Sequence, residues 1–252
     1  EAQLDASASV PGTFAYTPAA GTVLNAGEGQ PLSVTFTPDD AANYTSASVT
    51  TVLNVTKAPQ VITFTPIPAK TFGDAPFPVA ASATSGLPVS VSVVSGPAQL
   101  GDGAVTLTGA GEVTLRLSQA GSANYFAAGE VEERFTVAQA IPLVVWSAPE
   151  AVAYGTPLSE AQLNATASVP GTFVYTPAAG TLLPVGADQT LAVAFVPLDA
   201  VNYAPASVST TLTVTKAAQT IAWDPVPGKV YGDAPFAVNA RASSGLAVTL
   251  SV

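Results

Sequence analysis

The chain has 252 residues, with 17 acidic and seven basic side chains, a formal net charge of −10, and no Cys, Met or His. The acidic balance argues against nucleic acid and anionic membranes as partners, because both require a basic patch. Without Cys and His there is no disulfide framework, no thiolate metal site and no usual nucleophile–base pair. No apolar run approaches the roughly 18 residues of a transmembrane helix, so we expect no membrane insertion in this segment.

A tandem duplication organises the chain. Residues 1–93 align with residues 160–252 at a constant offset of 159 without a gap, and about 58 of the 93 pairs are identical. Each repeat contains two related halves that open and close with β-runs, as expected of a repeat architecture. The sequence predicts four modules, of which the first and last are partial: 1–58, 59–140, 141–217 and 218–252.

Strand signals follow one another along the modules. Apolar and polar residues alternate in 32–36, 89–93 and 113–117, and a period of two places one set of side chains in a core. Turn signals such as Pro11-Gly12 and Gly101-Asp102-Gly103 separate these runs. No segment has a convincing period of 3.6. Short strands spaced by turns predict an all-β fold of tandem antiparallel Ig-like β-sandwich modules.

Strand-to-strand junctions link the predicted modules. The stretch Leu53–Phe64 returns as Leu212–Trp223, and a looser version is Phe135–Trp146. In each, the last strand of one module runs across two or three residues into the first strand of the next. Such short, often Pro-bearing junctions leave little slack, so we expect an elongated, semi-rigid rod. The partial end modules favour a window of a longer chain.

Two motifs recur in the modules. The first is an aromatic-Gly turn, in which Gly permits a positive φ, the aromatic turns inward and Asp accepts backbone N–H groups; it occurs at Phe72-Gly73-Asp74, Tyr231-Gly232-Asp233 and Tyr154-Gly155-Thr156. The second is an Asn-Tyr pair, in which Asn tolerates a left-handed turn and the Tyr hydroxyl ties to the backbone as a tyrosine corner does; it occurs at Asn43-Tyr44, Asn124-Tyr125 and Asn202-Tyr203.

Together with the closing Val-Thr-Lys-Ala strand, these motifs make the whole chain resemble bacterial immunoglobulin-like repeats of the MBG type. Such repeats occur in large secreted or surface-attached bacterial proteins. The resemblance implies a seven-stranded Ig-like sandwich, an extracellular or cell-surface location and no catalysis. It implies no catalytic, cofactor-binding or metal residue, because such repeats have no general active site. The half with Tyr154-Gly155-Thr156 departs from the pattern by lacking the Asp.

Carboxylates are the first candidates for chemistry. Asp40 recurs as Asp199, whereas Asp39 is replaced by Leu198, so a loop cap is favoured over a calcium site, which needs several oxygen ligands. Asp74 and Asp233 are expected to cap turns. Glu130, Glu132, Glu133 and Arg134 form the densest charge cluster. Alternation from Phe135 and Val137 predicts that Glu133 points inward, where a charge discourages edge pairing; a paired-carboxylate hydrolase site is strongly disfavoured.

Lysines and aromatic residues are the other candidates. Lys57 and Lys216 stand at the junctions, where solvent is expected, and an isopeptide cross-link from them is disfavoured. Four aromatic residues could either stack on sugars or pack in a core, and we expect core packing. They are Trp146, Trp223, Tyr154 and Tyr231.

These observations favour a structural segment of a long extracellular bacterial fibre or adhesin stalk, acting as spacer and tension-bearing rod, with neighbouring repeats as its partners. Two alternatives stay open. One is a glycan- or matrix-binding adhesive module, which an aromatic patch recurring every 159 residues would favour. The other is self-assembly with other copies by strand exchange at the incomplete end modules. An enzyme is the least favoured class.

Overall fold

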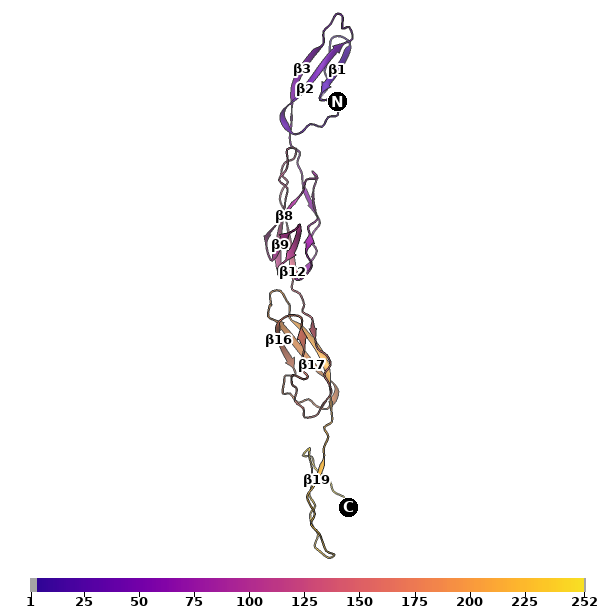
Figure 1. Cartoon of the computed structure of the whole chain (residues 1–252), viewed down its shortest axis with the longest axis vertical. Coiled ribbons are helices and arrows are strands. Elements are labelled where there is room, and N and C mark those ends of the chain that lie inside the picture. The colour runs from indigo at the N-terminus through magenta and orange to yellow at the C-terminus, as the bar shows by residue number, and fades with distance from the viewer. Residues whose placement is uncertain (1–3, 252) are drawn as a thin grey trace. The chain divides into compact units, whose positions relative to one another are not determined.

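The computed structural model describes residues 4–251, in which every regular element is a strand (Figure 1). No helix of this part of the chain is long and apolar enough to cross a membrane. The chain forms two compact units, Glu1–Ala140 and Ile141–Val252. The boundary between the units falls where the sequence predicts residues 59–140 to end; the division into four modules stays a prediction.

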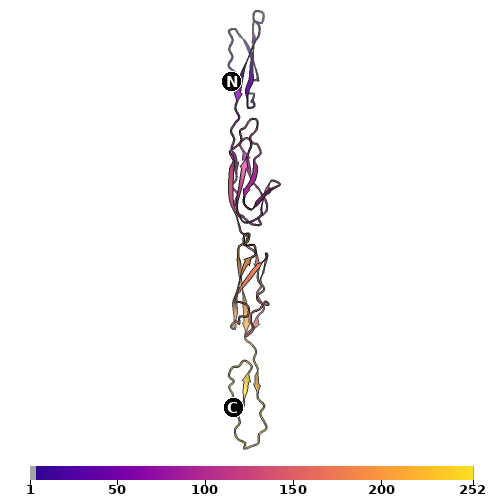
Figure 2. The same ribbon diagram turned by 90° about the vertical axis from the view of Figure 1, so that its left-hand side faces the viewer.

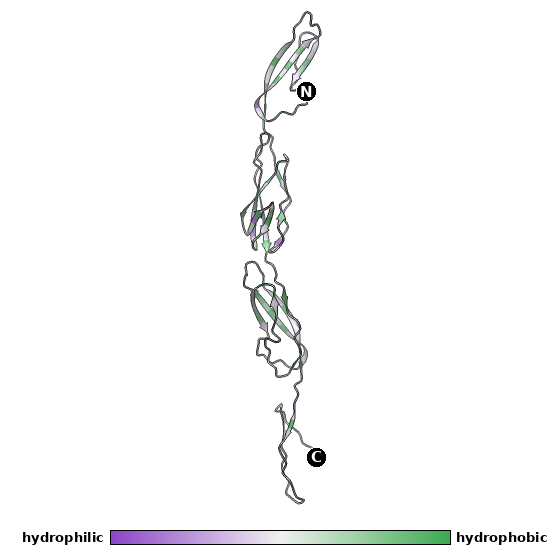
Figure 3. Cartoon of the chain, in the orientation of Figure 1, coloured by the Kyte–Doolittle hydropathy of each residue, from purple (hydrophilic) through white to green (hydrophobic). Residues whose placement is uncertain are grey.

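Residues 4–58 form one three-stranded antiparallel sheet in the order β1-β2-β3. Its strands are β1 (Gly12–Thr17), β2 (Gly27–Pro38) and β3 (Ala47–Val55). The predicted alternation over 32–36 lies on β2, and Phe14 of β1 is opposite Phe36. Apolar residues lie at intervals along these strands in Figure 3, as period-two patterning requires.

Residues 59–140 form a β-sandwich. One sheet has the order β5-β12-β11-β8 and another β6-β10-β9, while β4 and β7 pair separately. The strands are β4 (Ile62–Phe64), β5 (Lys70–Thr71), β6 (Phe77–Pro78), β7 (Ala81–Ala83), β8 (Ser90–Ser95), β9 (Ala98–Gly101), β10 (Ala104–Leu107), β11 (Gly111–Ser118) and β12 (Val131–Ala138). Val105 of one sheet and Val113, Leu115 and Val137 of the other share a buried core. All pairings are antiparallel except β5 with β12.

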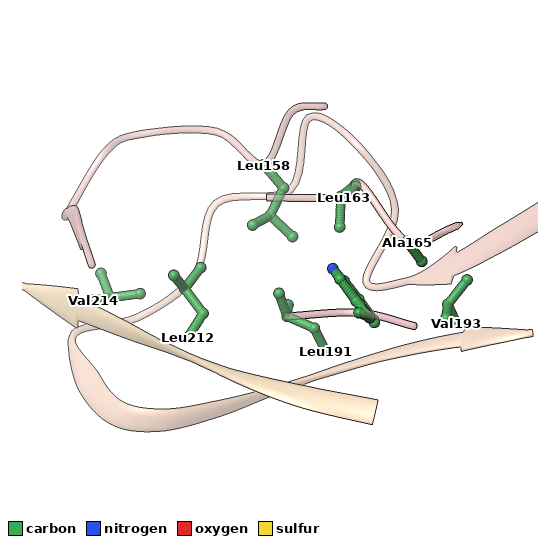
Figure 4. Close-up of a cluster of buried hydrophobic side chains, with 8 residues drawn as sticks. Leu158, Leu163, Ala165, Leu191, Val193, Leu212 and Val214 are labelled. Carbon is green, nitrogen blue, oxygen red and sulfur yellow. The ribbon is translucent and has the colours of Figure 1, made fainter. Parts of the chain in front are cut away.

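Residues 141–217 form a second sandwich, with sheets β14-β18-β17-β16 and β13-β15. The strands are β13 (Val144–Val145), β14 (Val152–Ala153), β15 (Thr166–Ala167), β16 (Gly171–Thr176), β17 (Gly186–Pro197) and β18 (Ala206–Thr215). Leu191, Val193 and Leu212 of the larger sheet pack with Leu158 and Leu163 in a buried cluster (Figure 4). The pairing of β14 with β18 is parallel.

Residues 218–251 contain one antiparallel strand pair, β19 (Ile221–Trp223) with β20 (Ala240–Ala242), seen near the C-terminus in Figure 2. In this part of the chain most side chains are exposed. The prediction that Trp223 and Tyr231 pack in a core is therefore wrong: they are 59% and 106% exposed. The aligned residues Phe64 and Phe72 are half-buried, because 59–140 supplies a second layer of strands.

The predicted backbone conformation of the aromatic-Gly turns is confirmed, but not every aromatic side chain points into a core as predicted. Gly73, Gly155 and Gly232 all have φ between 92° and 96°, a region that Gly enters without strain. Asp74 Oδ2 accepts Thr71 N–H at 2.9 Å, and Asp233 does the same for Val230. Phe72 packs against the core. Tyr154, by contrast, is 56% exposed, so its predicted inward packing is also wrong, whereas Trp146 is buried as predicted.

The Asn-Tyr prediction is wrong for the backbone of its Asn residues. Asn43, Asn124 and Asn202 do not have a positive φ. Two tyrosines outside these pairs bind backbone through their hydroxyls: Tyr16 Oη accepts Ala6 N–H at 3.1 Å, and Tyr175 Oη accepts Ala165 N–H at 2.9 Å. These tyrosines lie on β1 and β16, and each hydroxyl holds the residues that precede its strand.

Candidate functional site: the junction at Leu53–Phe64

The junction between 1–58 and 59–140 is held by main-chain hydrogen bonds at Ala58. Ala58 N–H donates to Asn124 O at 2.8 Å, and Phe126 N–H donates to Ala58 O at 3.0 Å. Ala58 thereby forms a parallel bridge with Tyr125. The linker residue is thus incorporated into the edge of the following module, which removes slack that a free linker would retain.

Asn124 connects the same loop to the preceding module. Its Nδ2 donates to Asn25 Oδ1 at 2.9 Å, and its Oδ1 accepts Ala26 N–H at 2.8 Å. Both halves of the amide are used, so the side chain is fixed in orientation. Since Asn25 and Ala26 precede β2 while Asn124 lies between β11 and β12, this one side chain joins the β1-β2-β3 sheet to the sandwich of 59–140.

The residue three positions before each Asn explains why Asn124 acts differently from the other two. Asn43 Nδ2 donates to Asp40 Oδ2, and Asn202 donates to Asp199 Oδ2, each at 2.8 Å. The corresponding residue before Asn124 is Gly121. With no carboxylate to hold it, the Asn124 amide reaches residues 25 and 26. Gly121 is also required by space, because a Cβ there would lie 2.6 Å from Tyr125 O.

Lys57 completes the junction. Its Nζ donates to the Ser122 carbonyl at 2.8 Å. The ammonium contacts a main-chain oxygen rather than an Asn side chain, so this geometry does not favour an isopeptide bond. The side chain is exposed, as predicted, and a single exposed contact of this kind adds little stability.

A buried glutamine pair lies directly behind the junction. Gln60 and Gln119 are 6% and 8% exposed. Gln60 Nε2 donates to Gln119 Oε1 at 2.5 Å and to Phe126 O at 2.7 Å, while its Oε1 accepts the Ser85 hydroxyl. Gln119 Oε1 also accepts Gly121 N–H at 2.5 Å. A buried hydrogen-bonded network specifies one arrangement, and here it holds the loop that bears Asn124.

This network was missed by sequence reasoning. Its signal is that Gln60 recurs as Gln219 and Ser85 as Ser244 across the duplication. The Ser-to-Gln hydrogen bond recurs as well, with Ser244 Oγ donating to Gln219 Oε1 at 2.5 Å. In 218–251 this recurring pair is exposed, whereas Gln60 is buried, so the repeat indicates the hydrogen bond but not its burial.

Outside the junction, the carboxylates singled out in the sequence cap loops or form surface ion pairs. Asp40 and Asp199 cap their loops as predicted. Glu133 lies on the Phe135 face, half-buried as predicted, and accepts Ile67 N–H at 3.1 Å. Glu132 pairs with Arg134 and Arg116, at 3.3 and 3.4 Å, and their hydrogen bonds lower its pKa. No group of three metal-ligating residues occurs within 4–251.

The Asp40 cap gives a pH-dependent prediction. Hydrogen bonds from Asn43 lower the Asp40 pKa from its ordinary value of 3.8. A lowered pKa in the folded state means that the cap stabilises the loop above pH 3.8 and is lost as the pH falls through the lowered pKa. Asn43→Ala should raise the Asp40 pKa toward 3.8 in a side-chain NMR titration. An unchanged pKa in that variant would contradict the cap.

Comparisons with known proteins place no family on the chain. No family model matches it, and no curated protein does. Among solved structures, Drosophila N-cadherin EC1-4 is similar at 13% identity and a TM-score of 0.26, covering 84% of this chain and 67% of that one. Drosophila N-cadherin EC1-3 is similar at 14% identity and a TM-score of 0.26, covering 74% and 77%.

Proposed function

We propose that this chain is a spacer segment of a long extracellular bacterial fibre or adhesin stalk, built from MBG-type Ig-like repeats whose junctions resist bending and carry tension. The observation that carries the proposal is the junction itself. Main-chain bonds at Ala58, the two bonds of Asn124 and the Lys57 contact concentrate polar interactions where one module meets the next.

The location of the bonds suits a load-bearing role. A pull along the chain at Ala58 acts on the bridge between Ala58 and Tyr125, and Tyr125 lies in the loop between β11 and β12. Behind it the Gln60 network anchors the loop in the interior. Force is thereby passed into the packed module instead of being taken by a free linker.

Small-angle scattering of the whole chain tests this function. Each sandwich with strands of about eight residues spans roughly 40 Å including loops, so a spacer should give a strongly elongated particle. Inserting four Gly/Ser residues after Ala58 should broaden the distance distribution, because a longer, flexible linker raises the entropic cost of keeping the Ala58 and Asn124 bonds closed, while the melting of each module stays nearly unchanged. The same insertion in the exposed turn at Gly101-Asp102-Gly103 is the control. A compact particle, or equal broadening by both insertions, contradicts the spacer.

Glycan or matrix binding is the second candidate, and exposed Trp223 is the observation that favours it. It does not recur as a patch, because the aligned Phe64 is half-buried. A glycan array on the whole chain, repeated with Trp223→Ala, tests this function. Specific signals that disappear in the variant would favour binding; a blank array, or signals that survive the substitution, would reject this site.

A further inference from the structure

The strand β16 has an open edge. The sheet order β14-β18-β17-β16 places β16 at a margin of the sheet, with β17 as its neighbour (Figure 1). Within 4–251, no main-chain hydrogen bond outside the ladder with β17 involves residues 172–176. The strand belongs to the sandwich of 141–217, which has both of its sheets, so the open edge is a property of the fold. Such an edge presents N–H and C=O groups that can pair with another chain.

The features that protect an edge strand are missing from β16. Charged side chains and prolines within an edge strand discourage pairing between molecules. Residues 161–187 contain no Asp, Glu, Lys or Arg, although the chain has a net charge of −10. Pro170 and Pro177 flank the strand and do not interrupt it. They confine pairing to the six residues of Gly171–Thr176 without preventing it.

The sequence of β16 is nearly symmetric about Val174. Its second to sixth residues read Thr-Phe-Val-Tyr-Thr. When two such strands pair antiparallel with Val174 opposite Val174, Phe173 of each strand faces Tyr175 of the other. The flanking threonines then face one another as well. Aromatic, β-branched and Thr–Thr pairs are the cross-strand pairs that stabilise a sheet, so a two-fold axis at Val174 makes every opposed pair favourable, as an isologous contact requires.

The face of β16 and β17 that points away from the core is apolar in this copy. Val174 and Val196 are diagonal neighbours on this face, and Leu198 follows on the same side by alternation. These three side chains are 59%, 45% and 83% exposed. The aligned residues of the first copy are smaller or polar: Ala15, Thr37 and Asp39. Exposed apolar side chains gathered in one place mark a contact surface, and here they adjoin the open edge.

We propose that β16 is a self-association edge, through which two copies of this chain pair antiparallel, with Val174 opposite Val174, into one continuous sheet. Val174 and Val196 of both copies then form an apolar row across the two-fold axis. β1 has the same symmetric pattern with Ala15 at its centre, and we expect it to pair more weakly because Ala adds less apolar surface. The spacer function concerns junctions within one chain, so either proposal can fail without the other.

Sedimentation equilibrium of the whole chain tests the association. We expect a monomer–dimer equilibrium between about 1 μM and about 1 mM, because six paired residues on each strand make a small interface. Hydrogen exchange of the β16 amides should slow as the protein concentration rises, while exchange in β1 changes less. A monomer throughout this range, or protection that rises at β1 and not at β16, overturns the proposal.

Charged substitutions at Val174 test the register. Val174→Lys and Val174→Glu should each weaken the dimer at least about tenfold, because the two-fold axis places like charges directly opposite each other. Mixing the two variant proteins should restore association, since a Lys then faces a Glu across the axis. Ala15→Lys, at the aligned position of β1, is the matched control and should leave the dimer intact. Dimers that persist in both single variants, or that mixing does not restore, overturn the proposed pairing.

Discussion

Replacing Leu191 by alanine should lower the free energy of unfolding of residues 141–217 by about 3 kcal/mol, within the range of about 2–5 kcal/mol for buried Leu-to-Ala changes. Leu191 is fully buried, and its neighbours in the cluster include Trp146, Leu158 and Leu212. Trp146 and Leu158 lie in the loops after β13 and β14, and Leu212 lies on β18, so these neighbours cannot all move into the space left behind. Urea unfolding followed by Trp146 fluorescence measures the loss, because Trp223 is already exposed.

Leu32→Ala is the matched control, since Leu32 and Leu191 align across the duplication. Leu32 is half-buried, so its truncation removes less buried surface and leaves no closed cavity. We expect a loss below about 1.5 kcal/mol, seen as faster hydrogen exchange in β2 with no change in the Trp146 transition. Equal losses at the two positions would mean that Leu32 is as well packed as Leu191, which would contradict the difference in their burial.

This contrast shows which part of the fold is readable from the sequence. Period-two alternation and turn residues depend on a few neighbouring positions, so the strands at 32–36, 89–93 and 113–117 and the positive φ at Gly73 were predictable. Burial depends on partners far along the chain. Leu32 and Leu191 lie in strands with the same apolar alternation but differ in burial, and the aligned aromatic residues Phe64 and Trp223 also differ in burial.

The junction was predictable as a place but not as a set of contacts. The recurrence of Leu53–Phe64 locates the junction in the sequence, and Asn124-Tyr125 is one of the repeated Asn-Tyr pairs. The use of Asn124 as an intermodule link depends on Gly121 in place of an Asp and on Asn25, 99 residues away, accepting its amide. The second copy has Pro184 where the first has Asn25, so a comparison of the copies alone obscures this contact.

Replacing Gln60 by leucine should destabilise residues 59–140 by about 2–4 kcal/mol. The substitution removes the donor to Phe126 O and the acceptor of the Ser85 hydroxyl, and each buried polar group left without a partner costs about 1–3 kcal/mol. Gln119 keeps Gly121 N–H as a donor, which limits the loss. Hydrogen exchange of the β11 amides reports the change, since β11 lies in the core sheet.

The aligned substitution Gln219→Leu shows whether the expected loss of stability comes from burial of the glutamine or from the residue type alone. Gln219 accepts the hydrogen bond from Ser244 but is exposed. Water can therefore replace the hydrogen bond that the substitution removes, and the free energy of unfolding should change by no more than about 0.5 kcal/mol. Gln60→Leu should also loosen the junction, because Phe126, whose carbonyl it orphans, donates to Ala58 O. Faster exchange at Phe126 N–H than at β11 would show that the network holds the loop locally. Equal stability of the Gln60→Leu protein and the parent would show instead that the loop is fixed by Ala58 and Asn124 without the glutamine pair.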